Sequence, residues 1–591
     1  MTKQAYEELE VGEQVIRAFL GGKGLGAYLL YKLLKPKADP LGPDNLLMFL
    51  TGPLTSTGYP TSGRVVVVTK SPLTGLFLDS HTGGAFGPEL RRTGYDGLVI
   101  TGRAEEPVYL WLEDGELEFR DASRAWNQPV DKAVELIRAE TDPRAHVAVI
   151  GPAGERTVRF AAIMFDRDED PWRSGVAGRG GAGAVMGSKR LKAVAVRARK
   201  GRVEIHDEKA FKALLKHLYA KVRKAPSFYI RRAVGTSYWL EPMNRLGFLP
   251  TRNFTSGFIE DHYALTAAYL RAHVVKDVAC AYCPLRCGKV VRTPEGEAKV
   301  EYELLAMMGA NDGIKDALEV ARSIKLVTEL GLDGISTGVV ISFAMEAGEK
   351  GLLKGVPSFG DAEGQRELVR KIAYREGVGD LLAEGVKRAA EALGGEALKL
   401  AMHVKGMELP GYDPRASWGM ALAYATADRG GCHQRAWTVR AEIDGRLKRF
   451  SKEGVAKFVK EVQDERSAAY SLVVCDFLPL GVEDFIEGLK CAAGLEYGVE
   501  DYLRVGERIW NLTRLFNIRE AGISRADDTL PPRVFEEPLP TSPWGGEARL
   551  PKEVFEAMLD EYYALRGWDP ATGRPTPEKL RELGLDRLIA L

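Results

Sequence analysis

The pattern of apolar positions divides the chain into a β-rich first third and a mainly helical remainder. In the first 200 residues the apolar runs are short, β-branched and bounded by glycine, proline or aspartate, which is typical of strands. The strands that we predict are Val65–Thr69, Leu98–Thr101, Val108–Leu112, Leu117–Arg120, Val147–Ile150 and Ala193–Arg197.

The later two thirds carry apolar side chains at the three- and four-residue spacing of amphipathic helices. One helix is predicted from Leu381 to Leu393, with Asp380 as its N-cap and Gly394-Gly395 as its stop. A second helix is predicted over Tyr502–Phe516. This order of elements predicts an α+β fold, in which a β-rich part precedes the helices.

The length of 591 residues exceeds that of one usual domain several times, so we expect several cores. The polar, charged segment Lys200–Asp207 is the first expected boundary, and Glu408–Pro414 is the second. The predicted domains are a β-rich N-terminal domain over residues 1–200 and two mainly helical domains over residues 201–408 and 409–591.

The composition is that of an ordinary globular protein. Hydrophobic residues make up 45% and charged residues 28%, and 82 basic residues balance 82 acidic ones. This balance gives no electrostatic reason to expect a nucleic-acid partner. The apolar run from Val15 to Leu34 contains Arg17 and Lys23, so we expect no membrane span.

Two further counts bear on where the protein works. Six cysteines are too few for a disulfide framework in a chain of this length, and no secretory leader is visible, so we expect a cytoplasmic protein. The chain has only 7 Asn and 6 Gln beside abundant Arg and Glu, which favours a thermophilic source over an effect of genomic base composition alone.

Glycine-rich segments recur in the first third of the chain. They are Gly21-Gly22-Lys23-Gly24, Gly83-Gly84 and Gly178-Arg179-Gly180-Gly181-Ala182-Gly183. Glycine allows backbone amides to approach a ligand closely, so we interpret them as connections moulded around a large, phosphate-bearing molecule.

Three cysteines stand within eight residues, as Cys280-Ala-Tyr-Cys283-Pro-Leu-Arg-Cys287. This spacing suits three corners of a [4Fe–4S] cluster, which needs four thiolates. Cys432, Cys475 and Cys491 are the candidates for the fourth corner. Structural zinc is an alternative, although no second short cysteine pair is present, and a loop that binds no metal is another.

Two polar segments are candidates for proton chemistry. His433 follows Arg429-Gly-Gly-Cys432, where the glycines indicate a tightly placed backbone. Glu301 and Glu303 precede an apolar stretch, so a carboxylate here is expected to enter the interior, where burial raises its pKa. A solvated surface pair is the plainer reading of the two glutamates.

Motifs along nearly the whole chain, in order, resemble those of the aldehyde:ferredoxin oxidoreductase family of tungsten-pterin enzymes. The matching segments are Gly52–Gly58, Ser62–Arg64, Ser71–Gly75, Gly83-Gly84, Gly94–Gly97, Gly178–Lys189, Pro410–Arg415, Ala423–His433, Gly506–Asn517 and Asp527–Arg533.

The resemblance implies the cofactors and their ligands. Family members hold a tungsten bispyranopterin, or a molybdenum analogue, with Mg²⁺ between the two pterin phosphates and no protein ligand to the tungsten. A [4Fe–4S] cluster lies beside it, and the matching ligands are Cys280, Cys283, Cys287 and Cys475. Residues that match the pterin contacts are Arg64, Ser80, His81, Thr82, Gly83, Gly84, Arg179, Gly180, Gly181 and Asp333.

The resemblance also implies the reaction. Glu303 matches the general base, His433 the hydrogen-bond donor to the substrate oxygen, and Tyr412 an orienting residue, with Glu301 as the alternative to Glu303. The expected activity is oxidation of a small aldehyde to the carboxylic acid, with ferredoxin as the electron acceptor. A homo-oligomer or a small iron–sulfur subunit is a further possible partner.

Two positions depart from the family pattern. Thr328 and Tyr470 stand where the family often has pterin-binding aspartates, and Glu329 is a possible substitute at the first. Two alternatives to aldehyde oxidation therefore stay open. One is a catalytic tungsten subunit of a larger complex that reduces carboxylic acids or aromatic acyl-thioesters, and the other is a non-catalytic iron–sulfur or cofactor-binding protein.

Overall fold

The N-terminal third of the chain builds two β-sheets. The computed structural model describes residues 1–165 and 175–590. The first sheet is antiparallel, in the order β3-β2-β1-β4, and the second is mixed, in the order β6-β5-β10-β7-β8-β9. Their strands are β1 (Leu47–Leu50), β2 (Arg64–Lys70), β3 (Phe77–Gly83), β4 (Gly97–Ile100), β5 (Val108–Glu113), β6 (Glu116–Asp121), β7 (His146–Val149), β8 (Ile163–Phe165), β9 (Gly175–Ala177) and β10 (Leu191–Arg197).

All six predicted strands are present, as β2, β4, β5, β6, β7 and β10. The strands β1, β3, β8 and β9 were not predicted. Strand β1 (Leu-Met-Phe-Leu) is as buried as β2 but contains no β-branched residue, the feature by which β2 was predicted. Strand β3 contains the polar residues Asp79, Ser80 and His81, which are stable in the interior only when other groups form hydrogen bonds or ion pairs with them.

The first sheet is buried on both faces. Phe49 and Val67 belong to one hydrophobic cluster, whereas Met48 and Val68 belong to another, because successive side chains of a strand point to opposite faces. The second cluster is formed with α1 (Glu13–Phe19), α2 (Gly22–Leu33) and the C-terminal helices. The sheet therefore lies in the interior, between two layers of the molecule.

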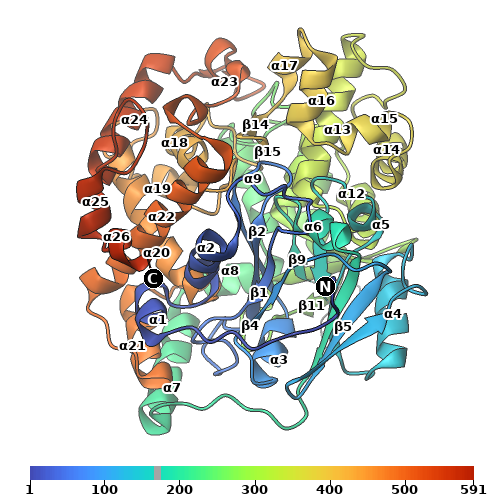
Figure 1. Cartoon of the computed structure of the whole chain (residues 1–591). Coiled ribbons are helices and arrows are strands. Elements are labelled where there is room, and N and C mark those ends of the chain that lie inside the picture. The colour runs from blue at the N-terminus through green and yellow to red at the C-terminus, as the bar shows by residue number, and fades with distance from the viewer. Residues whose placement is uncertain (166–174, 591) are drawn as a thin grey trace.

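The rest of the chain is mainly helical. Figure 1 shows the C-terminal helices on the left and those of residues 310–400 at the upper right, with α2 and β2 between them. The remaining helices are α3 (Phe86–Arg92), α4 (Val130–Glu140), α5 (Pro152–Glu155), α6 (Ala182–Ser188), α7 (Glu208–Lys224), α8 (Pro226–Val234), α9 (Leu240–Arg245), α10 (Ala267–His273), α11 (Tyr302–Met307), α12 (Ala317–Leu330), α13 (Gly334–Glu349), α14 (Ala362–Tyr374), α15 (Val378–Leu382), α16 (Val386–Leu393), α17 (Ala397–Leu400), α18 (Trp418–Thr426), α19 (Val439–Ile443), α20 (Val455–Ser471), α21 (Val482–Ala493), α22 (Val499–Ala521), α23 (Pro532–Glu536), α24 (Lys552–Arg566), α25 (Pro577–Glu582) and α26 (Leu585–Leu588).

Three small sheets interrupt the helices. They are the three-stranded sheet of β11 (Val274–Val278), β12 (Gly288–Thr293) and β13 (Gly296–Val300), and the hairpins β14 (His403–Val404) with β15 (Met407–Glu408) and β16 (Leu539–Pro540) with β17 (Glu547–Ala548). Among the described residues, we find no helix with both the length and the apolar character needed to cross a membrane.

Two local predictions need correction. The helix predicted from Leu381 to Leu393 is two short helices, α15 and α16, because Gly385 between them has φ 87°. Gly394 does end α16 with φ 68°, but Asp380 lies inside α15, whose N-cap is Gly377. The predicted helix over Tyr502–Phe516 is confirmed within α22.

The first glycine-rich segment forms the start of a helix rather than a loop. Residues 22–24 form the first turn of α2, which packs closely against the end of α20. A Cβ atom on Gly22 would lie 2.4 Å from a methyl group of Val473, and the Gly24 amide donates to Ser471 Oγ at 3.0 Å. These glycines serve close packing between the first and last thirds of the chain.

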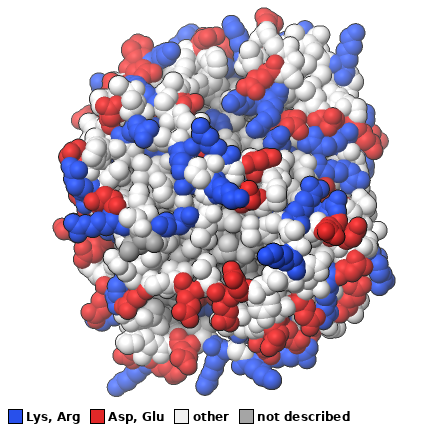
Figure 2. Space-filling model, in the orientation of Figure 1, with Lys and Arg blue, Asp and Glu red and all other residues white. Residues whose placement is uncertain are grey.

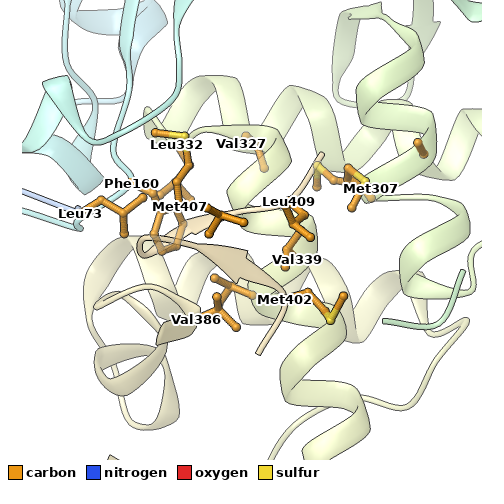
Figure 3. Packing of buried hydrophobic residues seen from close by; sticks show 14 of the residues in the cluster. Leu73, Phe160, Met307, Val327, Leu332, Val339, Val386, Met402, Met407 and Leu409 are labelled. Atoms are coloured by element: carbon orange, nitrogen blue, oxygen red, sulfur yellow. The ribbon is translucent and has the colours of Figure 1, made fainter. Parts of the chain in front are cut away.

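One hydrophobic core joins the N-terminal third to the later helices. Leu73 and Phe160 come from the N-terminal third, and Figure 3 shows them beside Met407 and Leu332 from the later part of the chain. Burial of a leucine or phenylalanine side chain stabilises a fold by about 1.5–3 kcal/mol. The segments that carry the candidate site residues are therefore held together by a continuous apolar interior.

Candidate active site and cluster site

The structure brings the four candidate cluster thiols together from two distant segments. Cys280, Cys283 and Cys287 lie on the loop between β11 and β12, and Cys475 lies beyond the end of α20. Thr61 links the two segments, because its amide donates to the Tyr282 carbonyl at 3.2 Å and its hydroxyl oxygen accepts from the Cys475 amide at 3.2 Å.

The four thiols lie within electrostatic range of one another. Burial, followed by the neighbouring Cys280, Cys475 and Cys287, raises the pKa of the Cys283 thiol. Burial likewise raises the pKa of Cys475 to about 12, although Arg64 opposes the shift. Bringing four thiolates together is therefore costly unless positive charge compensates them, as the iron ions of a cluster would.

In the part of the chain that the structure describes, no group of three or more His, Cys, Asp or Glu side chains could hold a single metal ion. A zinc ion needs its sulfur ligands about 2.3 Å away. A [4Fe–4S] cube instead holds its thiolates at four separate corners.

The start of β2 and the end of β3 lie directly against the cysteine loop. A Cβ atom on Gly83 would lie 2.3 Å from Cys280 Sγ, and one on Gly63 would lie 2.1 Å from the Ala281 carbonyl oxygen. The Ala281 amide donates to the Gly84 carbonyl at 3.0 Å. Glycine is required here by close approach, which accounts for the Gly83-Gly84 pair in the sequence.

Arg64, the first residue of β2, lies between the thiols and the polar residues beyond them. Burial alone would lower the pKa of its guanidinium, but nearby groups that become negative when ionised, Cys475 and Cys280 first and then Asp476 and Tyr470, raise it overall. Within the described residues, Arg64 Nε has no hydrogen-bond partner. The side chain is thus a cation available to a group between Cys475 and Tyr470.

Glu303, Tyr412 and His433 come together from three segments. Glu303 lies in the first turn of α11, Tyr412 follows β15, and His433 follows α18. The Gly411 amide donates to Glu303 Oε2 at 2.9 Å, and His433 Nε2 lies 3.4 Å from Glu303 Oε1. The Tyr412 and His433 ring centroids are 5.7 Å apart.

Burial controls the protonation of this group. Burial raises the pKa of Glu303 to about 7. Burial, together with the positive charge of Arg179 and Arg429, lowers the pKa of His433 well below its usual value. At neutral pH the imidazole is therefore uncharged, and the carboxyl is near the midpoint of its titration, as suits a general base.

The structure distinguishes the two candidate glutamates. Glu301 Oε1 lies 3.1 Å from Lys299 Nζ, and the Glu301 side chain is 41% exposed. Glu303, two residues on, faces His433 instead. Glu301 is therefore a surface residue in an ion pair, and Glu303 is the carboxyl that belongs to the candidate site.

Gln434 fixes the tautomer of His433. Its Nε2 lies 2.8 Å from His433 Nε2, and since an amide nitrogen only donates, His433 Nε2 accepts and the proton stands on Nδ1. In the described chain, His433 Nδ1 has no hydrogen-bond partner. Tyr470 holds Gln434 in turn, because its hydroxyl donates to the Gln434 carbonyl at 2.9 Å.

Arg179 is held between two elements. Its Nε lies 3.2 Å from Asp333 Oδ2, and its Nη2 donates to the Glu408 carbonyl. Asp333 also caps α13, accepting from the Ser336 amide at 3.0 Å. Gly181 has φ 87°, and a Cβ atom there would lie 2.0 Å from the Arg159 carbonyl oxygen, so the turn into α6 requires glycine.

The two positions that depart from the family pattern differ in their surroundings. Glu329 Oε1 lies 2.6 Å from Lys325 Nζ on the same helix, so its carboxylate is already engaged. The Thr328 hydroxyl donates to the Ile324 carbonyl within α12. Tyr470, in contrast, stacks on His81 with ring centroids 4.8 Å apart. Tyr470 thus lies beside His81, a predicted pterin contact, whereas Glu329 is paired with Lys325.

Sequence reasoning missed a buried charge network beside the site. Arg435 Nε donates to Asp428 Oδ1 at 2.8 Å, and Lys23 Nζ pairs with the same carboxylate. Asp79 accepts from Arg435 and lies 3.0 Å from His81 Nε2. Polar residues inside the predicted β-rich third were the available signal, but only the fold brings the partners together.

Cys432 lies among arginines rather than with the other cysteines. Arg429 Nη2 donates to its sulfur at 2.9 Å, and the nearby Arg429 and Arg435 lower the pKa of the thiol despite the opposing effect of burial. Cys491 instead lies in the hydrophobic cluster that includes α21. Neither thiol is among the neighbours that shift the pKa of Cys283.

The residues fit a polar, partly anionic group. In the described part of the chain, several buried polar atoms around these residues have no hydrogen-bond partner, although such atoms are normally paired in folded proteins. They are Arg64 Nε, His81 Nδ1, Arg179 Nη1, Arg429 Nε, His433 Nδ1 and Glu303 Oε1. The nitrogens of Arg64, Arg179 and Arg429 belong to cations, and His433 Nδ1 carries a proton. These four atoms can therefore donate hydrogen bonds to phosphate oxygens and pterin edges.

Sequence comparisons agree with this chemistry. The model of aldehyde ferredoxin oxidoreductase, N-terminal domain, matches residues 1–198, and that of domains 2 and 3 matches residues 213–585. The chain is 40% identical to a tungsten-containing aldehyde ferredoxin oxidoreductase of Pyrococcus abyssi, over all of this chain and 98% of the relative. It is 42% identical to the enzyme of that name from Pyrococcus furiosus, over 98% of this chain and 96% of the relative.

A solved structure has the same fold. It is the active-site complex BamBC of benzoyl coenzyme A reductase with 1,5-dienoyl-CoA. The superposition has a TM-score of 0.86 at 26% identity and covers all of this chain and 96% of the other.

Proposed function

Because this chain belongs to the aldehyde ferredoxin oxidoreductase family, we propose that it oxidises aldehydes to carboxylic acids with ferredoxin as the electron acceptor. The reaction adds water to the aldehyde and releases two electrons and two protons. The observation that carries the proposal is the Glu303–His433 pair among buried arginines that each keep a nitrogen without a hydrogen-bond partner in the described chain, together with the four gathered thiols.

The residues that would hold the cofactors follow from the unpartnered atoms. Arg64, the Ser80–Gly84 segment and Arg179–Gly181 would hold a tungsten bispyranopterin or its molybdenum analogue, together with Mg²⁺. Cys280, Cys283, Cys287 and Cys475 would hold the [4Fe–4S] cluster. When bound, the pterin-held metal supplies two-electron chemistry and the cluster passes electrons singly.

Glu303 acts as the general base. Its pKa of about 7 lets it take a proton from the attacking water or from the hydrated aldehyde at neutral pH. His433, uncharged and with its proton on Nδ1, donates a hydrogen bond to the substrate carbonyl oxygen. The Gly411 amide donates a hydrogen bond to Glu303 Oε2, so Oε1 is the oxygen that receives the proton.

Aromatic side chains beside the base would receive the substituent of the aldehyde. The Tyr412 ring packs against Tyr302 at 5.3 Å and Trp437 at 5.8 Å between centroids, and Trp437 packs against Trp239 at 5.0 Å. Apolar rings favour an apolar or aromatic substituent over a charged one. We therefore propose benzaldehyde-like and short aliphatic aldehydes as substrates.

We further propose that the protein works in the cytoplasm, since all six cysteines are free thiols, as is usual in reducing compartments.

The assay of the proposed activity is anaerobic oxidation of benzaldehyde and acetaldehyde by protein with measured tungsten and iron, with a viologen dye as acceptor and the acid quantified. Aldehyde-dependent dye reduction with a matching amount of acid supports the proposal. Metal-replete protein that reduces no dye with any aldehyde would refute it.

A second candidate function is reduction of an aromatic acyl-thioester within a larger complex. The full-length likeness to the benzoyl coenzyme A reductase complex favours it. Glu303 or His433 would then deliver protons rather than accept them. Incubation of the metal-replete protein with reduced dye and benzoyl coenzyme A distinguishes the two, since only this candidate predicts consumption of the thioester.

A further inference from the structure

The helices α7 and α8 form a strongly basic segment in a chain without net charge. Between Glu208 and Glu241 there are eight Lys and Arg residues and no Asp or Glu, whereas in the whole chain 82 basic residues balance 82 acidic ones. Figure 1 places α7 at the lower edge of the molecule, and Lys and Arg side chains project from this edge in Figure 2. Such local charge attracts acidic partners.

This basic segment packs directly on the cysteine loop. Val222 of α7 and Phe228 of α8 form a small buried cluster with Leu285, and Cys283 and Cys287 pack against it. Arg232 Nη1 donates to the Pro284 carbonyl at 2.7 Å, and Lys289 Nζ donates to the Arg232 carbonyl at 2.6 Å. The end of α7 and the start of α8 therefore lie beside two of the four thiols, those of Cys283 and Cys287.

The outer surface of this region mixes exposed rings with cations. Tyr229 and Ile230 are adjacent on α8 and are 59% and 49% exposed, and Tyr282 on the cysteine loop is 36% exposed. The cations Arg223, Lys224, Arg232 and Arg286 are also exposed. Exposed aromatic and arginine side chains together are typical of protein interfaces.

Acidic groups near this surface are already engaged by other cations. Asp484 pairs with Lys221 at 2.6 Å, Asp277 with Lys289 at 2.8 Å, and Asp476 with Arg466 at 3.0 Å. Within the described residues, Arg223, Lys224, Arg232 and Arg286 form no ion pair. These four cations thus have no carboxylate partner among the described residues, whereas Lys221 on the same helix pairs with Asp484.

We propose that this surface, which we call the cluster face (residues 223–232 and 282–286), is the docking site for an acidic one-electron carrier protein. The inference rests on the proposed function insofar as the four thiols hold a redox cluster. A carrier must approach that cluster where it lies nearest to the surface, and the three loop cysteines are half-buried there. A small, salt-sensitive interface suits a partner that must leave after each electron.

The test uses the holoenzyme, saturating aldehyde and a purified acidic [4Fe–4S] ferredoxin. The double variant R223E/K224E reverses two cations at the cluster face. The control K209E/K212E makes the same charge change about 20 Å away on α7, at a rise of about 1.5 Å per residue. We expect R223E/K224E to lower kcat/KM for ferredoxin at least about tenfold at low salt and to flatten its salt dependence.

The control variant should keep wild-type kcat/KM for ferredoxin, and both variants should keep the wild-type KM for aldehyde with viologen as acceptor. Y229A/I230A should raise KM for ferredoxin without changing the salt dependence. Unchanged ferredoxin kinetics in R223E/K224E, or an equal loss in K209E/K212E, would overturn the proposal.

Direct binding separates this proposal from the proposed function. Ferredoxin should bind the immobilised holoenzyme at low salt and lose affinity in R223E/K224E, whether or not an aldehyde is oxidised. If vesicles of anionic phospholipid or duplex DNA bind the cluster face while ferredoxin does not, the docking proposal is wrong even when aldehyde oxidation is confirmed.

Discussion

Replacing Glu303 with glutamine removes the carboxyl whose Oε1 lies 3.4 Å from His433 Nε2. Burial raises the pKa of Glu303 from its usual 4.5 to about 7. At 1.36 kcal/mol per unit, the folded protein favours the protonated form by about 3 kcal/mol relative to the unfolded chain. E303Q mimics that protonated form at every pH.

The sign of the effect follows from proton binding. Between pH 4.5 and 7 the unfolded chain releases this proton while the folded protein keeps it, so stability contributed by Glu303 is present below pH 4.5 and is lost as pH rises to 7. E303Q should therefore gain about 3 kcal/mol over wild type between pH 4.5 and pH 8. With an unfolding entropy of about 2.1 cal/mol/K per residue, this is a relative shift of about 3 °C in midpoint for cofactor-free protein.

The kinetic consequence has the same origin. A general base must be ionised in the free enzyme, so kcat/KM for the aldehyde should rise with pH through about 7 and level off above it. E303Q should lose about 10²–10⁴-fold in kcat with loss of this pH dependence. The assay is anaerobic dye reduction from pH 5.5 to 9 with metal-replete protein.

Glu301 provides the matched control, since it lies two residues away, is exposed and pairs with Lys299. E301Q should retain the wild-type pH profile and midpoint. If E303Q keeps wild-type turnover, or if E301Q loses activity to the same extent, the assignment of the base is wrong. If the difference in midpoint between E303Q and wild type is independent of pH, the pKa of Glu303 is not raised.

Three further predictions concern other parts of the site. Q434E places a carboxylate, which only accepts hydrogen bonds, beside His433 Nε2, so the imidazole proton should move to Nε2 and kcat should fall about 10²–10³-fold. Nitrogen NMR of histidine-labelled protein reports the tautomer and kinetics report kcat; an unchanged tautomer would refute the prediction. C475S should lose the iron–sulfur absorption band and most iron, whereas C491S should lose neither; iron retained in C475S would count against this ligand. D79N should cost about 3–5 kcal/mol in stability, because it leaves buried cations with less compensation, and a chemical denaturation midpoint equal to wild type would contradict this.

Sequence patterns carried the fold class because the features involved are local. Strand β6 alternates in side-chain exposure, a turn at Asp114-Gly115 separates it from β5, and Gly63 precedes β2. Helix α22 keeps the helical spacing of its apolar residues over its whole length. Strand β1 was missed because Leu-Met-Phe-Leu has no β-branched residue to distinguish it from a helical segment. The break between α15 and α16 was missed because a single glycine, Gly385, interrupts an otherwise continuous helical pattern.

The site was predictable only where chemistry is concentrated in short motifs. The cysteine loop and His433 stand out in the sequence, and the structure places the first beside Cys475 and the second beside Glu303. Gln434 gave no signal, since its role depends on a contact with a neighbouring imidazole. The Asp79–Arg435 pair joins residues that lie 356 positions apart, a contact that no local pattern encodes.

The most direct test of the account is metal analysis of protein purified anaerobically from cells supplied with tungstate, combined with electron paramagnetic resonance of the reduced sample. We predict about four iron atoms and one tungsten or molybdenum atom per chain, with a spectrum typical of a reduced [4Fe–4S] cluster. Protein that contains zinc in place of iron, or that contains iron but neither tungsten nor molybdenum, would contradict it.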